Sequence, residues 1–281
     1  MPYFTTALGK GVAKENSHLF CGSYLGAGTD QNVAAIMEES DCVLRVKQTV
    51  SINLEESHTT VGYEKYEAKV INIMEKLKTE LVSHKWAPNN DCALQMPARK
   101  PVKGPSTEVI THQWLWQRLT GYFRAGDLIY VENGTAQLGI SESYLLLDCD
   151  MCTQAIYGSI GYAAGASVGR SIAGQELGKY KRIVLITGEG SLQLTVQAMS
   201  LLSRYGITPV IYTVERILHG LNAPYNDVDD WSYGNIFKAM GSQTNEIRTF
   251  AVKEASKLDD LLASLEFNSC GLPAGTSINA K

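Results

Sequence analysis

Hydrophobic residues in the carboxyl-terminal half of the chain alternate between short continuous runs and helical spacing. Ile183 to Thr187 is an apolar run that ends in a Gly-Glu-Gly-Ser turn at residues 188–191. A helical segment, Leu192 to Arg204, then leads to a second apolar run, Ile207 to Tyr212. Short apolar runs bounded by glycine are typical of buried strands, so the pattern predicts a strand–helix–strand unit. Such a unit is right-handed and belongs to a parallel sheet.

The turn at residues 188–191 combines features that suit an anionic ligand and a metal ion. Open α/β sheets bind their ligands at the carboxyl ends of their strands, where this turn is predicted to lie. We expect Ser191 to cap the helix that follows. The helix end behind the two glycines offers N–H groups to an anion, and Glu189 is placed to face a metal bound to that anion.

Two more elements are predicted just upstream of this unit. Thr111 is expected to cap a helix that contains Trp114, Leu115 and Leu119, and this helix opens a new domain. Asp127 to Glu132 then reads as a strand that ends on glycine. The alternation of strands and helices over residues 107–281 therefore predicts one helix-flanked parallel sheet.

The amino-terminal part shows the same alternation on a smaller scale. Tyr3 to Ala7 and Asp41 to Val46 are predicted strands, and the apolar face of a helix is formed by Val70, Ile73, Met74, Leu77 and Leu81. Residues 86–106 contain prolines, two adjacent asparagines and basic residues, which predicts a linker. The predicted fold class is therefore α/β, with two doubly wound parallel-sheet domains at residues 1–85 and 107–281.

Composition and charge exclude several classes of protein. A chain of 281 residues with 44% hydrophobic and 19% charged residues is ordinary for a soluble globular protein. The formal net charge of −4 gives no electrostatic case for binding nucleic acid or an anionic membrane. The first residues lack a secretion signal, so we expect a cytoplasmic protein with reduced thiols. The glycine-rich segment 154–169 is too short for a membrane span.

Two short motifs have both a chemical and a structural interpretation. Cys149 and Cys152 have C-x-x-C spacing, but no second pair follows. A zinc site is therefore disfavoured. The favoured interpretation is that the two cysteines act as small apolar residues beside a loop, and a redox role is the lesser alternative. Residues 9–11, Gly-Lys-Gly, lack the frame of a phosphate-binding loop, which favours a plain turn. None of the five histidines has a predicted nucleophile or metal-ligand partner near it in sequence. No Ser-His-Asp triad therefore competes with the ligand site predicted at residues 188–191.

The residue types at positions 188–197 are more specific evidence than the spacing of these residues. Gly-Glu-Gly-Ser-Leu-Gln-Leu-Thr-Val-Gln closely resembles Gly-Asp-Gly-Ser-Leu-Gln-Leu-Thr-Val-Gln of thiamine-diphosphate-dependent decarboxylases of the pyruvate and indolepyruvate type. Residues 215–220, Glu-Arg-Ile-Leu-His-Gly, and residues 154–169 resemble further elements of that family. The resemblance covers nearly the whole chain. It implies a truncated, Rossmann-like middle domain at residues 1–85 and the thiamine-diphosphate-binding domain at residues 107–281.

The resemblance also implies cofactors, substrate and roles. The cofactors are thiamine diphosphate and Mg²⁺, and the substrate is pyruvate, with aromatic or branched 2-oxo acids left open. In the family a Gly-Thr loop lies against the diphosphate, a Gly-Ser-Ile segment lies beside the aminopyrimidine, and the acid between the glycines binds Mg²⁺. Glu189 takes that last position here, and Glu215 matches the catalytic Glu. The implied cofactor-binding residues are Gly134, Thr135, Gly158, Ser159, Ile160, Gly188, Glu189, Gly190 and Ser191.

The chain departs from the family pattern around the metal. Glu189 replaces Asp, and the extra methylene moves the carboxylate by ~1.5 Å, whereas Mg²⁺ demands near-ideal octahedral geometry at about 2.0–2.1 Å. An Asn-Asn-x-Gly element should follow the strand ending at Tyr212, but the chain continues directly into Thr-Val-Glu at residues 213–215. Residues 268–281 are small and polar where the family has a further strand and helix. We expect weakened cofactor binding.

The family's activating Glu and adjacent histidine pair belong to an amino-terminal domain that has no counterpart in this sequence. We therefore expect no activity from this chain alone. One hypothesis is a decarboxylase half completed by another chain. The other is a non-catalytic relative: a pseudoenzyme, a modulator of a full-length homologue, or the product of a faulty gene model. In the family the cofactor lies between subunits, so we expect a homo-oligomer or association with such a homologue through apolar surface beside Gly134, Ile160 and Ser191.

Overall fold

The computed structural model describes residues 3–12, 15, 17, 19–38, 59–61, 64–66, 70–83, 109–145, 148–207, 209–214, 228–229, 231–240, 248–264, 267 and 276–280. The chain divides into two compact units, Met1 with Ala35–Gln95 and Pro2–Ala34 with Met96–Lys281. The division falls within a helix near residue 35. The domain boundaries expected at residues 85 and 107 stay a prediction.

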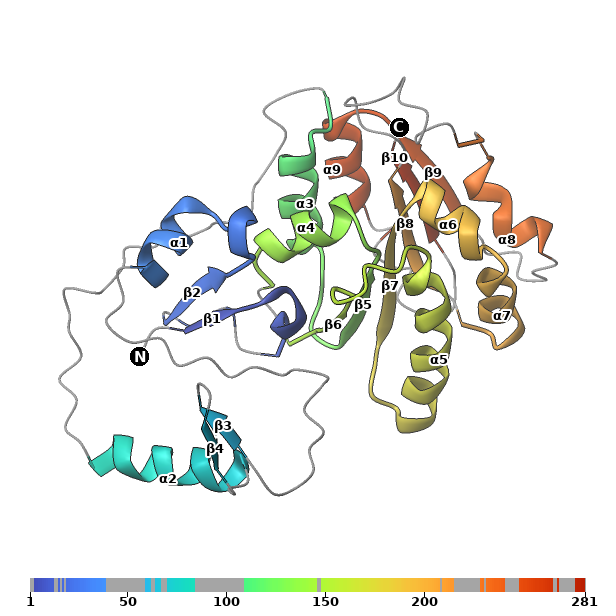
Figure 1. Ribbon diagram of the computed structural model, residues 1–281. Helices are drawn as coiled ribbons and strands as arrows, with labels where there is room; N and C mark the ends of the chain where they lie inside the picture. Colours follow the sequence, from blue (N-terminus) through green and yellow to red (C-terminus); the bar gives the residue numbers. More distant parts are fainter. Residues whose placement is uncertain are drawn as a thin grey trace. The chain divides into compact units, whose positions relative to one another are not determined.

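A six-stranded parallel sheet forms the centre of the larger unit (Figure 1). The strand order is β6-β5-β7-β8-β10-β9, and every neighbouring pair runs parallel. This arrangement confirms the predicted α/β fold class. The strands are β5 (Asp127–Val131), β6 (Asp150–Cys152), β7 (Arg182–Gly188), β8 (Val210–Val214), β9 (Arg248–Val252) and β10 (Thr276–Ala280).

Helices flank this sheet and bury both of its faces. Successive residues of a strand point to opposite faces, so Ile129 and Val131 belong to one hydrophobic cluster while Leu128 and Tyr130 belong to another. The first cluster contains residues of α3, α4 and α9, and the second contains residues of α5 and α7. The helices are α3 (His112–Thr120), α4 (Thr135–Glu142), α5 (Tyr162–Leu177), α6 (Glu189–Thr195), α7 (Ala198–Arg204), α8 (Ile236–Ala239) and α9 (Ala255–Ala263).

Several local predictions can be compared directly with this sheet. The Thr111 side chain accepts a hydrogen bond from the Trp114 N–H at 3.3 Å, which confirms the predicted cap of α3. Strand β8, however, continues to Val214, two residues beyond its predicted end at Tyr212. Both neighbouring strands pair with β8 as far as Val214, β7 through Gly188 and β10 through Ala280.

The carboxyl-terminal tail, described from the sequence as small and polar where the family has a further strand and helix, contributes β10. This strand lies between β8 and β9 and pairs with both. Its hydrogen bonds to two neighbours form the strand, and no hydrophobic run was needed to specify it. The absence of a strong apolar pattern in residues 268–281 therefore misled the sequence interpretation.

The described residues between 3 and 28 include a small parallel pair of strands with short helical turns. The strands are β1 (Tyr3–Thr5) and β2 (Phe20–Ser23), and the turns are η1 (Ala7–Gly9) and η2 (Gly26–Gly28). The Lys10 Nζ is buried and donates to the Glu15 carboxylate at 3.0 Å. Because this internal carboxylate pairs with the lysine, the geometry agrees with the plain turn predicted for residues 9–11.

The described part of the smaller unit contains a hairpin and a helix. Strands β3 (Thr59–Val61) and β4 (Glu64–Tyr66) pair antiparallel, and α2 (Val70–Ser83) confirms the helix predicted from its apolar spacing. The parallel sheet expected within residues 1–85 is therefore seen only in β1 and β2 among the described residues. The strand predicted at residues 41–46 lies outside them. Helix α1 (Gln31–Glu38) spans the division between the units.

Candidate functional site

Loops at the carboxyl edge of the large sheet hold most of the predicted site residues. Strand β5 is followed by Glu132, Asn133 and Gly134, and α4 begins at Thr135. Gly134 has a φ of 112°, which favours glycine, and nothing lies within 4 Å of the position that a Cβ would occupy. No side chain caps α4. The uncapped start of this helix therefore suits an anion.

The turn after β7 brings Gly188, Glu189, Gly190 and Ser191 to the same edge. Gly188 occupies the N-cap position in an extended conformation, and α6 begins at Glu189. Ser191 therefore lies in the first turn of α6, so the prediction that it is the N-cap was wrong. The acidic residue between the glycines already adopts helical geometry, which moves the cap position three residues upstream.

Glu215 is the first residue beyond β8. Gly188 pairs with Val214 in the parallel register of β7 and β8, so the two strands end level with each other. Glu215 itself lies outside the described residues, and its predicted catalytic role stays a prediction.

The loop after β6 carries Gly158, Ser159 and Ile160. The Gln154 Oε1 accepts hydrogen bonds from the backbone N–H groups of Tyr157 and Gly158, both at 2.9 Å. Gly158 has a φ of 61°, and the space where its Cβ would lie is open. Gln154 thus shapes the loop from its own start. The sequence interpretation missed this role because a lone glutamine before a glycine carries no distinctive signal.

Hydrogen bonds join the loops after β5, β6 and β7 into one surface. The Asn133 Nδ2 donates to the Ser159 carbonyl at 2.7 Å, which connects the first loop to the second. The Thr195 Oγ1, at the end of α6, donates to the Gly161 carbonyl at 2.8 Å, which connects the second loop to the helix that begins in the third. The structure therefore brings together the predicted residues at 134–135, 158–160 and 188–191 at one edge.

Glu132 is a buried acid at this edge that the sequence interpretation did not select. Its carboxylate accepts from the Asn133 N–H at 2.9 Å and from the Ala163 N–H at 3.1 Å. Burial raises the pKa of Glu132, and hydrogen bonds from the backbone N–H groups of Asn133, Ala163 and Gly161 lower it. The only sequence signal was an acid at the end of a buried strand, directly before a turn.

Three buried side-chain atoms at the carboxyl ends of strands have no hydrogen-bond partner within the described residues. They are Asn133 Oδ1 after β5, Thr153 Oγ1 after β6 and Thr213 Oγ1 near the end of β8. Buried polar atoms nearly always have a partner in native proteins, and each exception needs an explanation such as a water, an ion or a ligand. This edge therefore has hydrogen-bonding capacity that the described chain does not use.

The metal-binding capacity of the described residues is limited. Among them, no group of three or more His, Cys, Asp and Glu side chains is arranged to hold a metal ion. Glu189 is the carboxylate that the β7–α6 turn contributes. An octahedral ion such as Mg²⁺ would need further ligands from a bound diphosphate, from water or from residues beyond those described.

The C-x-x-C pair gives no sign of redox chemistry. Cys149 packs in the hydrophobic cluster on one face of the sheet, whereas Cys152 packs against the cluster on the other face. Both thiols are free, and burial raises the pKa of each, that of Cys149 to about 12. Because the thiolate is the reactive form, the structural interpretation of this pair is the better supported one.

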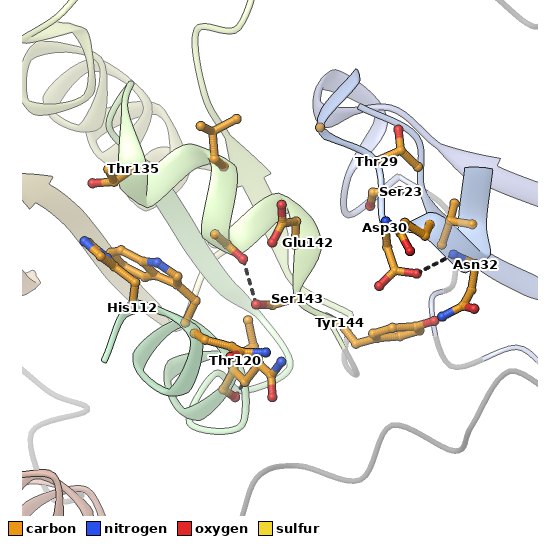
Figure 2. Close-up of a pocket in the computed structure, with 18 of the residues that line it drawn as sticks. Ser23, Thr29, Asp30, Asn32, His112, Thr120, Thr135, Glu142, Ser143 and Tyr144 are labelled. Atoms are coloured by element: carbon orange, nitrogen blue, oxygen red, sulfur yellow. Dashed lines mark hydrogen bonds between the residues drawn. The ribbon is translucent and has the colours of Figure 1, made fainter. Parts of the chain in front are cut away.

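A pocket of about 880 Å³, which shares Thr135 with the carboxyl edge, lies between residues 23–33 and helices α3 and α4 (Figure 2). Asp30 and Glu142 extend toward the space from opposite walls, and Thr135 lies at its far end. The described lining includes these two acids and no lysine or arginine. Residues 132–135, 158–161 and 188–191 at the carboxyl edge likewise include two acids, Glu132 and Glu189, and no lysine or arginine, so side-chain charge does not distinguish the two places.

Comparison with known proteins gives the following matches. Residues 136–216 match the family described as thiamine pyrophosphate enzyme, C-terminal TPP binding domain. Pyruvate decarboxylase of Aspergillus terreus is 29% identical over 293 residues, which cover 96% of this chain and 51% of that protein. Pyruvate decarboxylase isozyme 3 of Saccharomyces cerevisiae is 30% identical, with 95% and 51% covered. Pyruvate decarboxylase of Hanseniaspora uvarum is 33% identical, with 82% and 45% covered.

The chain spans about half the length of the curated relatives it matches. Among solved structures, a thiamin diphosphate-dependent enzyme of Mycobacterium smegmatis matches with a TM-score of 0.48 and 18% identity, covering 63% of this chain and 32% of that one. Within the described residues no helix has the length and apolar character that crossing a membrane requires.

Proposed function

Because the chain belongs to the family of thiamine-diphosphate-dependent decarboxylases of the pyruvate decarboxylase type, we propose that it supplies the cofactor-binding half of a carboxy-lyase for pyruvate or a related 2-oxo acid. The observation that carries the proposal is the joining of three loops at the carboxyl edge. The Asn133–Ser159 bond joins the loop of Gly134 to the loop of residues 158–160, and the Thr195–Gly161 bond ties the end of that second loop to α6, the helix that begins at Glu189. A cytoplasmic location is part of the same proposal.

Three features of this edge support cofactor binding. Gly134 and Thr135, with the uncapped start of α4, would bind the diphosphate through backbone N–H groups. Residues 158–160 would lie beside the aminopyrimidine, where Gly158 leaves open space. The unpartnered oxygens of Asn133 and Thr213 would accept hydrogen bonds from bound water or from the cofactor. When bound, thiamine diphosphate supplies the electron sink for decarboxylation.

The metal fits these residues less well than the organic cofactor does. Glu189 is the proposed protein ligand, and it replaces the shorter Asp of the family. Since the described residues provide no ready cluster of metal ligands, we expect the diphosphate to be held chiefly by N–H groups. The proposal is therefore weak binding of thiamine diphosphate that depends little on Mg²⁺. Replacing Glu189 by Asp is expected not to restore tight binding, because one carboxylate cannot complete an octahedral site.

The proton chemistry is assigned in part to Glu215. This residue directly follows β8, whose end is level with Gly188. By family resemblance it handles protons near the substrate, while a second Glu, on a domain outside these 281 residues, activates the cofactor. General acid–base assistance of this kind contributes roughly 10²–10⁴-fold to rate. We therefore propose that the 281-residue chain does not decarboxylate pyruvate on its own.

Calorimetric titration with thiamine diphosphate, with and without Mg²⁺, tests this proposal alongside a coupled acetaldehyde assay. The expected result is weak, saturable binding with little Mg²⁺ effect and no acetaldehyde above the level that free cofactor produces. Tight Mg²⁺-dependent binding would show that a complete metal site forms. Turnover that Glu215→Gln abolishes would show that the chain is active alone.

The second candidate function, a modulator that pairs with a full-length homologue, is favoured by exposed apolar side chains around the same edge. Ile156, Tyr157, Ile160 and Leu194 are all more than half exposed, with Tyr157 at 81%. Clustered apolar exposure of this kind marks interaction surfaces. We propose that this surface mediates a homo-oligomer or an association with such a homologue. A monomer that stays monomeric in sedimentation at micromolar concentration would contradict the homo-oligomer.

A further inference from the structure

We propose that Glu132 is a positioning residue that holds the loop of residues 158–161 against the loop after β5, and thereby sets the affinity of the carboxyl edge for thiamine diphosphate. The inference rests on the proposed function for its ligand. Its geometric part, the positioning of the loop, stands on the hydrogen bonds of Glu132 alone.

The backbone of Glu132 is fixed by the sheet. Its N–H donates to the Ile186 carbonyl of β7 at 2.9 Å, so Glu132 continues the ladder one step beyond β5. The side chain is 1% exposed. A side chain with so rigid a base has few conformations available, which suits a group that must hold other segments in place.

The carboxylate binds donors from two different segments. Oε1 accepts from the Asn133 N–H, next to Glu132 itself, and Oε2 accepts from the Ala163 N–H at the start of α5. The Gly161 N–H lies close enough to this carboxylate to lower its pKa. Gly161 directly follows Ile160 and has a φ of 87°. The acid therefore fixes the end of the loop at the residue where the chain turns into α5.

This arrangement uses a property that only a carboxylate has. An ionised carboxylate accepts through both oxygens and has no donor of its own, so several converging N–H groups can be satisfied at once. A glutamine of the same shape would direct an N–H₂ group at one set of these donors. A buried acid also carries a desolvation cost that an apolar residue would avoid. The acid is thus better explained by its backbone partners than by packing.

The other contacts of the loop show why Glu132 matters for its position. Asn133 holds the Ser159 carbonyl from one side, and Thr195 holds the Gly161 carbonyl from another. Glu132 connects both ends of this arrangement, because it accepts from the Asn133 N–H and also from the Ala163 N–H, two residues after Gly161. Without the carboxylate, Gly158 and Ile160 would lose their fixed distance from Gly134.

The test compares Glu132→Gln with Asp127→Asn, a matched change of a buried carboxylate at the opposite edge of the same sheet. We expect Glu132→Gln to speed amide exchange at Gly161 and Ala163 by about tenfold, and to weaken thiamine diphosphate binding by about tenfold, since hydrogen bonds to charged groups are worth that much. Asp127→Asn is expected to lower stability without changing exchange at residues 158–163 or the affinity.

The exchange measurement needs no cofactor, so it separates this inference from the proposed function. If the wild-type chain does not bind thiamine diphosphate, the proposed function fails while the exchange result still decides the positioning role. If Glu132→Gln does not fold, Glu132→Asp, which keeps the charge on a shorter side chain, is expected to show faster exchange confined to residues 158–163. Unchanged exchange in the folded variant, or acceleration spread equally over β5 and β7, would overturn the inference.

Discussion

The two edges of the large sheet differ in how their buried charged groups and oxygens are partnered, although the buried Tyr122 hydroxyl beside the amino edge also lacks a partner within the described residues. At the amino edge, Asp127 of β5 and Arg182 of β7 form a buried pair, with Nε–Oδ1 at 2.9 Å and Nη2–Oδ2 at 2.5 Å. The Arg124 N–H also donates to Asp127, and the guanidinium lies 4.5 Å from the centre of the Tyr122 ring. At the carboxyl edge, oxygens of Asn133, Thr153 and Thr213 are buried without a partner.

This difference indicates which edge is structural and which is open to a ligand. The chain itself provides the partners of the charged groups at the amino edge, so no further molecule is needed there. At the carboxyl edge the same strands end in loops whose glycines leave space and whose buried oxygens lack donors. The edges therefore should respond differently to substitution: stability at one, ligand affinity at the other.

The largest expected effect comes from breaking the amino-edge pair. Asp127→Ala leaves Arg182 buried without its partner, which typically costs about 3–5 kcal/mol of unfolding free energy. Urea denaturation followed by circular dichroism measures the change. Lys257→Ala is the control, because the Lys257–Glu254 pair is exposed and such pairs contribute ~0.2–1 kcal/mol. Equal losses of unfolding free energy in Asp127→Ala and Lys257→Ala would contradict a structural role for the buried pair at the amino edge.

A smaller loss is expected from overpacking α4, the helix that starts at the carboxyl edge. A Cβ on Gly139 would overlap the indole ring of Trp116, so Gly139→Ala should cost about 1–3 kcal/mol and shift α4. Gly165→Ala in α5 is the matched control, because nothing lies within 4 Å of its Cβ position. That change should stabilise the protein by roughly 0.5–1 kcal/mol. Thermal unfolding of both variants compares them, and a stable Gly139→Ala would be contrary to the geometry.

Removing an unpartnered hydroxyl should separate stability from function. Thr213→Val keeps the shape of the side chain and removes a buried oxygen without a partner, so we expect stability to stay equal or rise by about 1 kcal/mol. If that oxygen serves the cofactor, thiamine diphosphate binding should weaken at the same time. Calorimetry of binding and urea denaturation measure both. A loss of stability of the kind expected at Asp127 would mean that Thr213 has a structural partner.

The smallest effect is expected at the edge strand β6. Hydrogen bonds from Lys179 and Tyr180 hold the pKa of Asp150 below its ordinary value. Between the lowered pKa of the folded state and the ordinary pKa of the unfolded state, the folded protein therefore binds fewer protons than the unfolded one. Stability is lost as the pH falls through this interval. The stability difference between wild type and Asp150→Asn should shrink as pH is lowered from 7 to 3. The difference is small throughout, because these groups are partly exposed.

Local sequence patterns predicted the sheet well because each buried strand carries its own signal. The apolar run at residues 183–187 lies within β7, and the strand predicted at 127–132 is β5 to within one residue. The cap at Thr111 could also be predicted, since it depends on a residue and its near neighbours. β10 could not, because its hydrogen bonds come from two strands distant in sequence.

The site was predictable only where it resembled a known motif. The glycine loops carried that resemblance, whereas Glu132 and Asn133 act through bonds to residues 31 and 26 positions away. No periodicity or spacing encodes such contacts before the chain is folded. Ser191 was misassigned for a related reason: Gly188 and Ser191 both fit a cap, and only the backbone conformation shows that Gly188 takes that position.

Amide exchange of the 281-residue chain with and without saturating thiamine diphosphate tests the central claim most directly. We predict that the cofactor slows exchange at residues 133–136, 158–161 and 189–191, and leaves the amides around Asp127 and Arg182 at the amino edge unchanged. Protection confined to the pocket between residues 23–33 and α3, or no protection at any described residue while the chain stays folded, would contradict the assignment of the carboxyl edge as the cofactor site.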